Sequence, residues 1–146
     1  MGNLTRDFIF IHADTIFDET ILDDLIASNV SDIISPVDYK ACIEEEMKVT
    51  TVDGNVTAVH KPIDLKIAQG EFIGIAKIGT CILDKLKLAV IVELKEKNNH
   101  QNYFEAAIQN LIDQGNNIKT IVTNGRPWFE IDFPQDFEAA KTLFFK

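Results

Sequence analysis

The sequence predicts an α/β fold with a mixed, mainly parallel sheet that is flanked by helices and carries an inserted β-hairpin. An apolar run over residues 8–11, a helical pattern and a second apolar run over residues 32–38 follow the order of a β-α-β unit. Asp53-Gly54 separates two alternating runs, which is the strongest short signal for a hairpin. Residues 104–112 carry a helical stripe of apolar side chains in front of another strand-like run.

The first third of the chain predicts two parallel strands joined by a helix. Residues 8–11 are continuously apolar and rich in β-formers, the pattern of a strand that is covered on both faces. Asp18 and Glu19 begin a helix with an acidic first turn, and apolar residues at helical spacing continue to Ile26. Because a helical crossover joins parallel strands, the second strand should run parallel to the first. Pro36 should end that strand or confine it to a sheet edge, since proline cannot donate to a ladder.

The middle of the chain predicts a hairpin, a further strand and a helix. The runs over residues 47–52 and 55–60 form the two arms of the hairpin. Residues 72–78 are another strand, in which Gly74 marks a bulge or a close backbone approach. Residues 82–97 fit a helix or a strand, and we favour a helix because the segment is long and rich in Lys and Glu near its end.

The last part of the chain repeats the alternation of helix and strand. The helix over residues 104–112 ends near Gly115, and residues 118–122 form a strand. Pro134 suits the first position of a last helix, where its missing N–H is not needed. Since the sequence shows no internal repeat, low-complexity tract or linker, we expect residues 1–146 to form a single domain.

Composition limits the classes of function. A chain of 146 residues with 46% hydrophobic content can bury a sizeable core. The formal net charge of −9 at pH 7 argues against nucleic acid and against an anionic membrane surface as partners. Cys42 and Cys81 lack the spacing of a metal site or a disulfide framework, which indicates free thiols in a reducing cytoplasm. No apolar run approaches membrane-spanning length, so we expect a soluble cytoplasmic protein.

Two aspartates stand at positions typical of a ligand site. Asp14 directly follows the first predicted strand, and Asp132 lies in the turn before the last helix. At one sheet edge, the two carboxylates would suit a hard cation such as Mg²⁺, with substrate phosphates supplying further oxygens. The alternatives are a turn cap for Asp14 and a helix N-cap for Asp132. The histidines show no paired spacing for zinc, and His12 is interpreted as a packed strand histidine or a residue behind the metal ligands.

The order of these motifs resembles the C-terminal half of nucleoside triphosphate transferases with the glycosyltransferase-A-like, or nucleotide-diphospho-sugar transferase, fold. The similar branch is the cholinephosphate and phosphonate cytidylyltransferases. The most specific match is the stretch over residues 128–137, which reads WFEIDFPQDF. The weaker matches follow in the same order and lie in residues 8–14, 37–39, 47–56, 60–62 and 70–75.

The resemblance implies a magnesium-dependent nucleotidyl transfer. An acceptor phosphate would attack the α-phosphorus of a nucleotide, expected to be CTP, and pyrophosphate would leave. By the resemblance, Asp14 and Asp132 are the metal ligands, and Lys61 is a catalytic cation near a substrate phosphate. A solvated lysine is the plain alternative for Lys61.

The resemblance also implies an acceptor side of the cleft. The strand over residues 70–75 would line it, which makes Asp38 and Glu71 candidate acceptor contacts, although both could be ordinary strand-end charges. Trp128 and Tyr39 could contact a choline-type acceptor, because a quaternary ammonium is attracted to aromatic faces. A core or lid aromatic is the alternative for Trp128. The expected acceptor is a small phosphorylated molecule such as phosphocholine or a phosphonate.

The family's N-terminal nucleotide-binding half has no counterpart in this sequence. The segment Gly70-Glu71-Phe72-Ile73-Gly74 lies in a strand and carries no basic loop that could hold a triphosphate. We therefore expect the chain alone to be inactive, and its first strand to expose an apolar edge. A homodimer or a separate N-terminal half would cover that edge. Phe133 replaces a usual Thr or Ser, and His12-Ala13 replaces a commoner Gly.

Two other functions remain open from the sequence. A non-catalytic binding or assembly subunit could derive from a truncated nucleotidyltransferase. A receiver-like, doubly wound domain with an acidic pocket is a weaker alternative, because the Asp53-Gly54 hairpin interrupts the alternation of strands and helices that such a domain requires.

Overall fold

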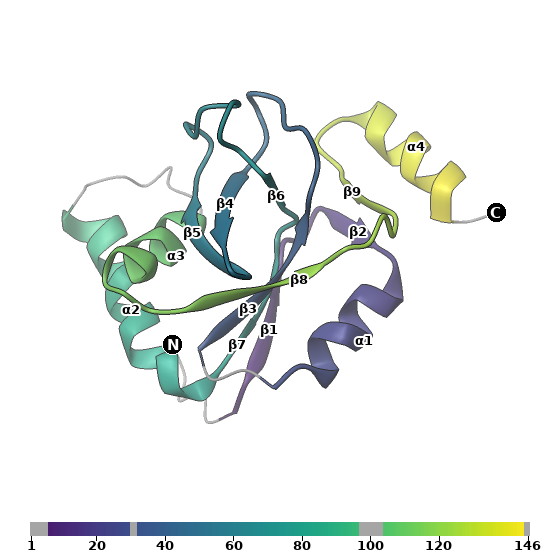
Figure 1. Ribbon diagram of the computed structural model, residues 1–146. Helices are drawn as coiled ribbons and strands as arrows, with labels where there is room; N and C mark the ends of the chain where they lie inside the picture. Colours follow the sequence, from purple (N-terminus) through teal and green to yellow (C-terminus); the bar gives the residue numbers. More distant parts are fainter. Residues whose placement is uncertain (1–5, 30–31, 97–103, 145–146) are drawn as a thin grey trace.

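The computed structural model describes residues 6–29, 32–96 and 104–144, and the described residues form a mixed sheet with helices on both faces (Figure 1). The sheet has seven strands in the order β1-β7-β3-β6-β4-β5-β8, and β2 pairs separately with β9. The strands are β1 (Phe8–Ile11), β2 (Thr15–Phe17), β3 (Ile33–Asp38), β4 (Lys48–Val52), β5 (Asn55–Val59), β6 (Gly70–Phe72), β7 (Ile75–Ile78), β8 (Ile118–Val122) and β9 (Trp128–Glu130). The helices are α1 (Glu19–Ala27), α2 (Leu83–Ile91), α3 (Phe104–Asp113) and α4 (Pro134–Phe144), with short helical turns η1 (Thr80–Ile82) and η2 (Val92–Glu96) around α2.

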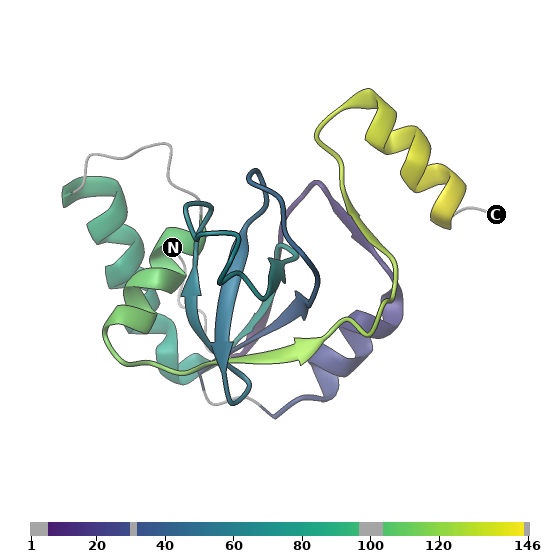
Figure 2. The ribbon, with the colours of Figure 1, turned by 45° about the horizontal axis from the view of Figure 1, so that its top comes forward.

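The central strand β3 contributes to two hydrophobic cores. Ile33 and Val37 belong to the larger core, together with buried side chains of α2 and α3. Ile34 belongs to the smaller core, where Ile21 and Leu25 of α1 pack. Successive residues of a strand face opposite sides of the sheet, so β3 is covered on both faces. Figures 1 and 2 show α2 and α3 on one side of the sheet, α1 on the other, and α4 beside β9 outside these layers.

The predicted fold class is confirmed, but the pairing directions differ from the expectation of a mainly parallel sheet. Among the described strands, only β3 and β8 pair in parallel, and the other pairings are antiparallel. Strands β1 and β3 do run in the same direction, because both are antiparallel to β7. They are not neighbours, since β7 follows the hairpin and inserts between them. The β-α-β unit therefore exists with an antiparallel strand inside it.

Pro36 lies in the centre of the sheet, so its predicted edge position is wrong. It pairs in register with Ile121 of β8, on the parallel side of β3. On the other side, β3 pairs with β7 through Ile33 and Ile34 and with β6 from Val37 onward. The ladder is interrupted between these two contacts, so a residue without an N–H is tolerated there. The hydroxyl of Ser35 instead donates to the carbonyl of Ile75 at 2.9 Å.

The local signals of the middle segment are confirmed. Asp53 and Gly54 have φ values of 50° and 72°, as a type I′ hairpin turn requires. Gly74, with φ 75°, separates β6 from β7 at the predicted irregularity. The ambiguous segment is helical in α2 and η2 up to Glu96, and residue 97 lies outside the described residues. None of the described helices is long and apolar enough to cross a membrane.

Replacing a core residue of β3 should destabilise the protein far more than replacing an exposed residue of the same type. Ile33 is 0% exposed, and we expect Ile33→Ala to reduce the free energy of unfolding by about 2–5 kcal/mol through lost burial and a residual cavity. Ile67 is 62% exposed, and Ile67→Ala should change it by less than about 0.5 kcal/mol. Urea denaturation followed by circular dichroism measures both. Equal losses would contradict the assigned core.

Candidate active site

A cleft of about 720 Å³ opens where the end of β1 meets the end of β9. Residues from the turn after β1, the loop after β5, α3 and β9 line it. Phe10, Met47 and Phe72 supply part of its apolar wall. Its charged and titratable lining consists of His12, Asp14, Glu45, Lys61, Glu105, Glu130 and Asp132.

The antiparallel pairing of β2 with β9 brings Asp14 and Asp132 to this cleft. Thr15 is in register with Glu130, and the N–H of Ile131 donates to the carbonyl of Asp14 at 2.9 Å. Partial burial, followed by repulsion from Glu130 and Asp14, raises the pKa of Asp132. Both aspartates line one cleft and influence each other electrostatically. Their role as metal ligands stays a prediction.

The start of α4 is capped by a residue other than Asp132. The N–H groups of Asp132 and Phe133 donate to Asp136 Oδ2 at 3.2 and 2.8 Å. Asp136, in the first turn of α4, thus accepts backbone N–H groups that a helix start leaves unpaired. The N-cap alternative considered for Asp132 is therefore unnecessary, and its carboxylate belongs to the cleft.

Lys61 lies in the same cleft as the two aspartates. It is in a turn after β5, near the carboxylates of Glu130 and Asp132. Its positive charge contributes to lowering the pKa of Glu130 and opposes the upward shift at Asp132. The predicted cation and the predicted metal ligands therefore line the same cleft, and their roles stay predictions.

His12 lines the cleft between two glutamates, which the sequence did not indicate. Its Nε2 lies 3.0 Å from Glu105 Oε1, and its Nδ1 lies 3.9 Å from Glu130 Oε1. Hydrogen bonding with Glu105, then with Glu130, raises the pKa of His12 to about 10 despite its partial burial. A signal was available in the sequence, because His12 and Asp14 are two positions apart at the end of a strand, where alternate residues share a face.

Gly74 allows the ring of His12 to sit where it does. The N–H of His12 donates to the carbonyl of Gly74 at 2.8 Å. A Cβ at Gly74 would lie 2.8 Å from His12 Nδ1 and 2.9 Å from Thr15 Oγ1. Phe10 and Phe72 contact the imidazole edge-on, with ring centroids 5.3 and 6.0 Å away. The expected close backbone approach at Gly74 is therefore against the His12 side chain.

Glu105 is the second site residue that sequence reasoning missed. It is 1% exposed, in the first turn of α3, and it lines the cleft. A buried carboxylate is costly unless a cation accompanies it, and His12 is in contact with it. The signal was weak, because a glutamate beside the apolar stripe of an amphipathic helix usually points to solvent.

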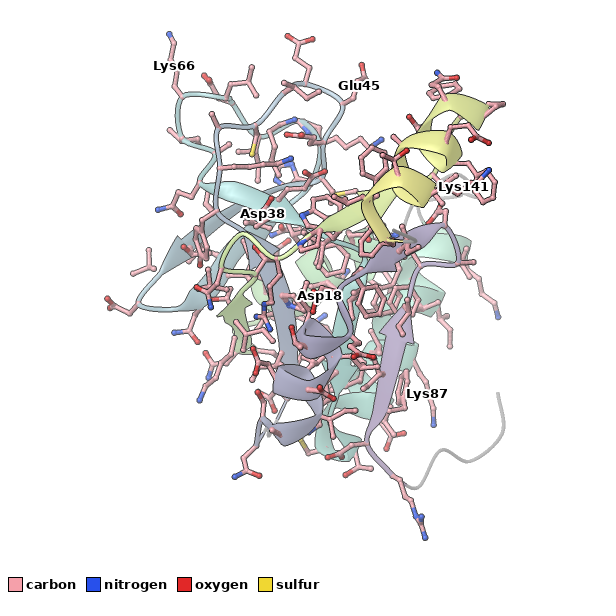
Figure 3. All side chains as sticks on the ribbon, turned by 90° about the vertical axis from the view of Figure 1, so that its right-hand side faces the viewer. Asp18, Asp38, Glu45, Lys66, Lys87 and Lys141 are labelled. Carbon is pink, nitrogen blue, oxygen red and sulfur yellow. The ribbon has the colours of Figure 1, made fainter. Side chains whose placement is uncertain are left out.

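A second recess of about 300 Å³ adjoins the cleft and shares Glu130 with it. Three predicted acceptor residues, Asp38, Glu71 and Trp128, line this recess together. Trp128 Nε1 donates to Asp38 Oδ2 at 3.1 Å, and Thr123 Oγ1 donates to Asp38 Oδ1 at 2.8 Å. In Figure 3, Asp38 lies near the middle of the molecule, whereas Glu45 stands on the outer loop between β3 and β4.

An ammonium group occupies part of this recess. Lys40 Nζ lies 2.7 Å from Glu71 Oε2, 2.9 Å from Glu46 Oε1 and 5.4 Å from the centroid of the Trp128 ring. Burial raises the pKa of Glu71 to about 7, although Lys40 opposes the shift. Burial also disfavours the charged form of Lys40, but Glu71 and Glu46 outweigh it and raise the pKa of Lys40. The recess is therefore acidic and aromatic, and it accommodates a cation.

Tyr39 is separate from both recesses. Its hydroxyl lies 3.2 Å from Thr120 Oγ1 and 3.4 Å from Thr51 Oγ1, on the side of β8 and the hairpin. It belongs to the lining of neither recess. The described structure therefore offers no support for Tyr39 as an acceptor contact.

Metal coordination is feasible at one group of side chains in the described residues. His12, Asp14 and Glu130 each offer a ligand atom, and these atoms all lie within 4.8 Å of one another. Carboxylate oxygens suit Mg²⁺, and an added imidazole nitrogen suits transition-metal ions. The residues of the cleft thus fit a divalent cation by their donor atoms.

Comparison with known proteins shows the fold. No family model and no curated protein matches the sequence. The inositol-1-phosphate CTP transferase from T. maritima matches with a TM-score of 0.71 and 19% identity over 92% of this chain and 53% of its own. The CTP:phosphocholine cytidylyltransferase from Streptococcus pneumoniae matches with a TM-score of 0.67 and 15% identity over 92% of this chain and 56% of its own. The chain has the nucleotidyltransferase fold and spans about half the length of these structures.

The protonation of His12 should depend on Glu105. We expect the His12 imidazole to titrate near pH 10 in NMR spectra, and Glu105→Gln to move its midpoint down toward the ordinary value of 6.5. Because the folded-state pKa is raised, this pair stabilises the fold fully below pH 6.5 and loses that contribution as the pH rises through about 10. Stability measured against pH should therefore differ between wild type and Glu105→Gln mainly below pH 10. A wild-type midpoint near 6.5 would contradict the pairing.

Two glycine substitutions separate backbone strain from contact with His12. Gly54 and Gly74 have similar φ values of 72° and 75°, so alanine is strained at both. At Gly54 nothing lies within 4 Å of the added Cβ, and we expect a loss of about 1 kcal/mol. At Gly74 the Cβ meets the His12 ring, so we expect about 1–3 kcal/mol more from overpacking. Thermal or urea unfolding measures the difference, and equal losses would show that His12 moves away freely.

Proposed function

We propose that this chain is the acceptor- and metal-binding half of a nucleotidyltransferase. The reaction is transfer of a nucleotidyl group, CMP from CTP, to a small phosphorylated acceptor such as phosphocholine or a phosphonate. The observation that carries the proposal is the cleft lined by Asp14 and Asp132, which the β2–β9 pairing brings together, and by Lys61 from the turn after β5. The shared fold with nucleotidyltransferases supports it.

The residues of the cleft suit a reaction between two anions. Asp14 and Asp132 would hold Mg²⁺, which when bound neutralises negative charge on phosphate oxygens. Lys61 pairs with a phosphate oxygen and reduces the repulsion between acceptor and nucleotide. An acceptor phosphate oxygen attacks the α-phosphorus, the bond from that phosphorus to the bridging oxygen breaks, and pyrophosphate leaves with the electron pair. The chain supplies alignment and charge, and no covalent intermediate is needed.

The adjoining recess suits the organic part of the acceptor. Asp38, Glu71 and Trp128 line it, and the ammonium group of Lys40 lies over the Trp128 ring. A positively charged acceptor head would be attracted to the same ring face and the same carboxylates. Glu130 belongs to both recesses, so an acceptor in one would present its phosphate to the other.

The triphosphate-binding part is proposed to come from another polypeptide segment. Among the described residues, the cleft lining contains no glycine-rich, arginine-bearing loop. Strand β1 pairs with β7 on one side, and no other described strand pairs with it. We propose that a separate N-terminal half, or a second copy of the chain, adds to this edge in the cytoplasm, and that the chain by itself turns over little substrate. A purely non-catalytic assembly subunit is less favoured, because it would not need the charged cleft.

Removal of either aspartate carboxylate should abolish transfer. In a protein reconstituted with a nucleotide-binding half, Asp14→Asn and Asp132→Asn should each lower kcat/KM by at least about 100-fold, the typical effect of losing one charge-stabilising group. Pyrophosphate release from CTP in the presence of phosphocholine and Mg²⁺ measures this.

The matched control is Asp23→Asn. Asp23 is an exposed aspartate of α1, outside both recesses, and its replacement should leave kcat/KM unchanged. Retained turnover in the Asp14 or Asp132 variant would remove the assignment of the metal ligands. If calorimetric titration of Mg²⁺ and CTP into the chain, alone or reconstituted, gives no heat of binding, the non-catalytic assembly subunit is favoured.

A further inference from the structure

We propose that the cleft contains a nitrogen-bearing metal site, formed by His12 Nδ1 and the carboxylates of Asp14 and Glu130, that binds a transition-metal ion such as Mn²⁺, Co²⁺ or Zn²⁺. This site shares Asp14 with the magnesium site proposed above. Its ligand set is different, because it requires His12 and Glu130 and does not require Asp132. Its existence does not depend on nucleotidyl transfer.

The three donor atoms are close enough for one ion. They lie within 4.8 Å of one another. Three ligands spread around an ion at about 2.0–2.2 Å are separated by about 3.1–3.8 Å, so side-chain shifts of up to about 1 Å complete the set. The side chain of Glu130 is 42% exposed and can make such a shift without repacking the core.

The far side of the His12 ring is arranged as in histidines that ligate metals. Its Nε2 lies 3.0 Å from Glu105 Oε1, and Glu105 is 1% exposed. A carboxylate on one ring nitrogen orients the imidazole and makes the other nitrogen a stronger ligand. Both carboxylate oxygens of Glu105 are buried without a hydrogen-bond partner in the described part of the chain, so the ion-pair contact of Oε1 with His12 is the charge compensation seen there. This buried negative charge favours additional positive charge nearby.

Gly74 keeps the space beside Nδ1 open. A Cβ at this position would lie 2.8 Å from Nδ1 and 2.9 Å from the ring carbon Cγ of His12. A side chain would therefore fill the volume next to the donor nitrogen. The same glycine anchors the backbone of His12 through its carbonyl at 2.8 Å, so the open side of the ring and its position are set together.

A metal ion at this site would lie between the imidazole and two carboxylates. His12 Nδ1 lies 3.9 Å from Glu130 Oε1, and Asp14 offers the third donor atom within 4.8 Å. An ion binds the lone pair of Nδ1, so a proton on that nitrogen would pass to solvent. Lys61 opposes the ion electrostatically, since it is near the same carboxylates. The ion must therefore gain from a nitrogen bond, which favours Co²⁺ and Zn²⁺ over the oxygen-preferring Mg²⁺. Mn²⁺ also prefers oxygen ligands, so a nitrogen bond to Mn²⁺ is a strict test of the imidazole as a ligand.

The test uses the purified chain with Mn²⁺ and no nucleotide. Pulsed electron paramagnetic resonance reports directly whether a histidine nitrogen is bonded to Mn²⁺. We expect a nitrogen coupling in the wild-type protein and its loss in His12→Gln. Asp132→Asn should keep the coupling. Glu130→Gln and Glu105→Gln should weaken Mn²⁺ binding, the latter by about 10–100-fold, as is typical of residues that orient a metal-bound histidine.

Glu130→Gln keeps the proposal testable if His12→Gln does not fold. Glu130 is exposed, so this variant should melt as the wild type does and still bind Mn²⁺ more weakly. Absence of nitrogen coupling in the folded wild-type protein would overturn the proposal. So would loss of Mn²⁺ binding in Asp132→Asn together with retention in His12→Gln, which would indicate an oxygen-only site. That second outcome leaves the proposed transfer function intact, whereas nitrogen coupling without any transfer activity contradicts only the transfer function.

Discussion

The pairing of β2 with β9 is the constraint on which the rest of the site depends. These short strands come from opposite ends of the chain, and their register places Asp14 beside Ile131. Three carboxylates, those of Asp14, Glu130 and Asp132, are held near each other as a result. Like charges repel, so such a cluster is stable only with cations around it. His12 and Lys61 supply positive charge from the turn after β1 and the loop after β5.

The two recesses differ in their side chains. The larger cleft holds His12, Lys61 and several carboxylates, and the smaller recess presents Trp128 among carboxylates. Glu130 borders both, so it couples the two electrostatically. Lys40 already neutralises part of the smaller recess, which means that a cationic ligand would have to compete with an internal ammonium. The protein therefore balances its surplus negative charge locally, with a few well-placed cations.

Local sequence signals predicted most elements. The Asp53-Gly54 turn, the first position of α4 at Pro134 and the stripe along α3 all depend on neighbours in sequence, and all are present. The pairing of strands was predicted less well. Strand β7 lies between β1 and β3, and Pro36 lies in the centre of the sheet. Both features depend on where the β6–β7 segment inserts into the sheet. Periodicity along the chain contains no information about that insertion.

The residues of the candidate site also divide into those predicted from the sequence and those found only in the tertiary structure. The sequence by itself determined the residue types that can handle phosphate and metal, and it located Asp14, Asp132 and Lys61 at strand ends and turns where ligands bind. Only the tertiary structure decided that His12 lies between two glutamates and that Glu105 is buried against it. It also directed the hydroxyl of Tyr39 toward Thr120, away from the recess that Asp38 and Trp128 line. The physical reason is that burial and charge pairing depend on segments distant in sequence, whereas turns and helix starts depend on a few adjacent residues.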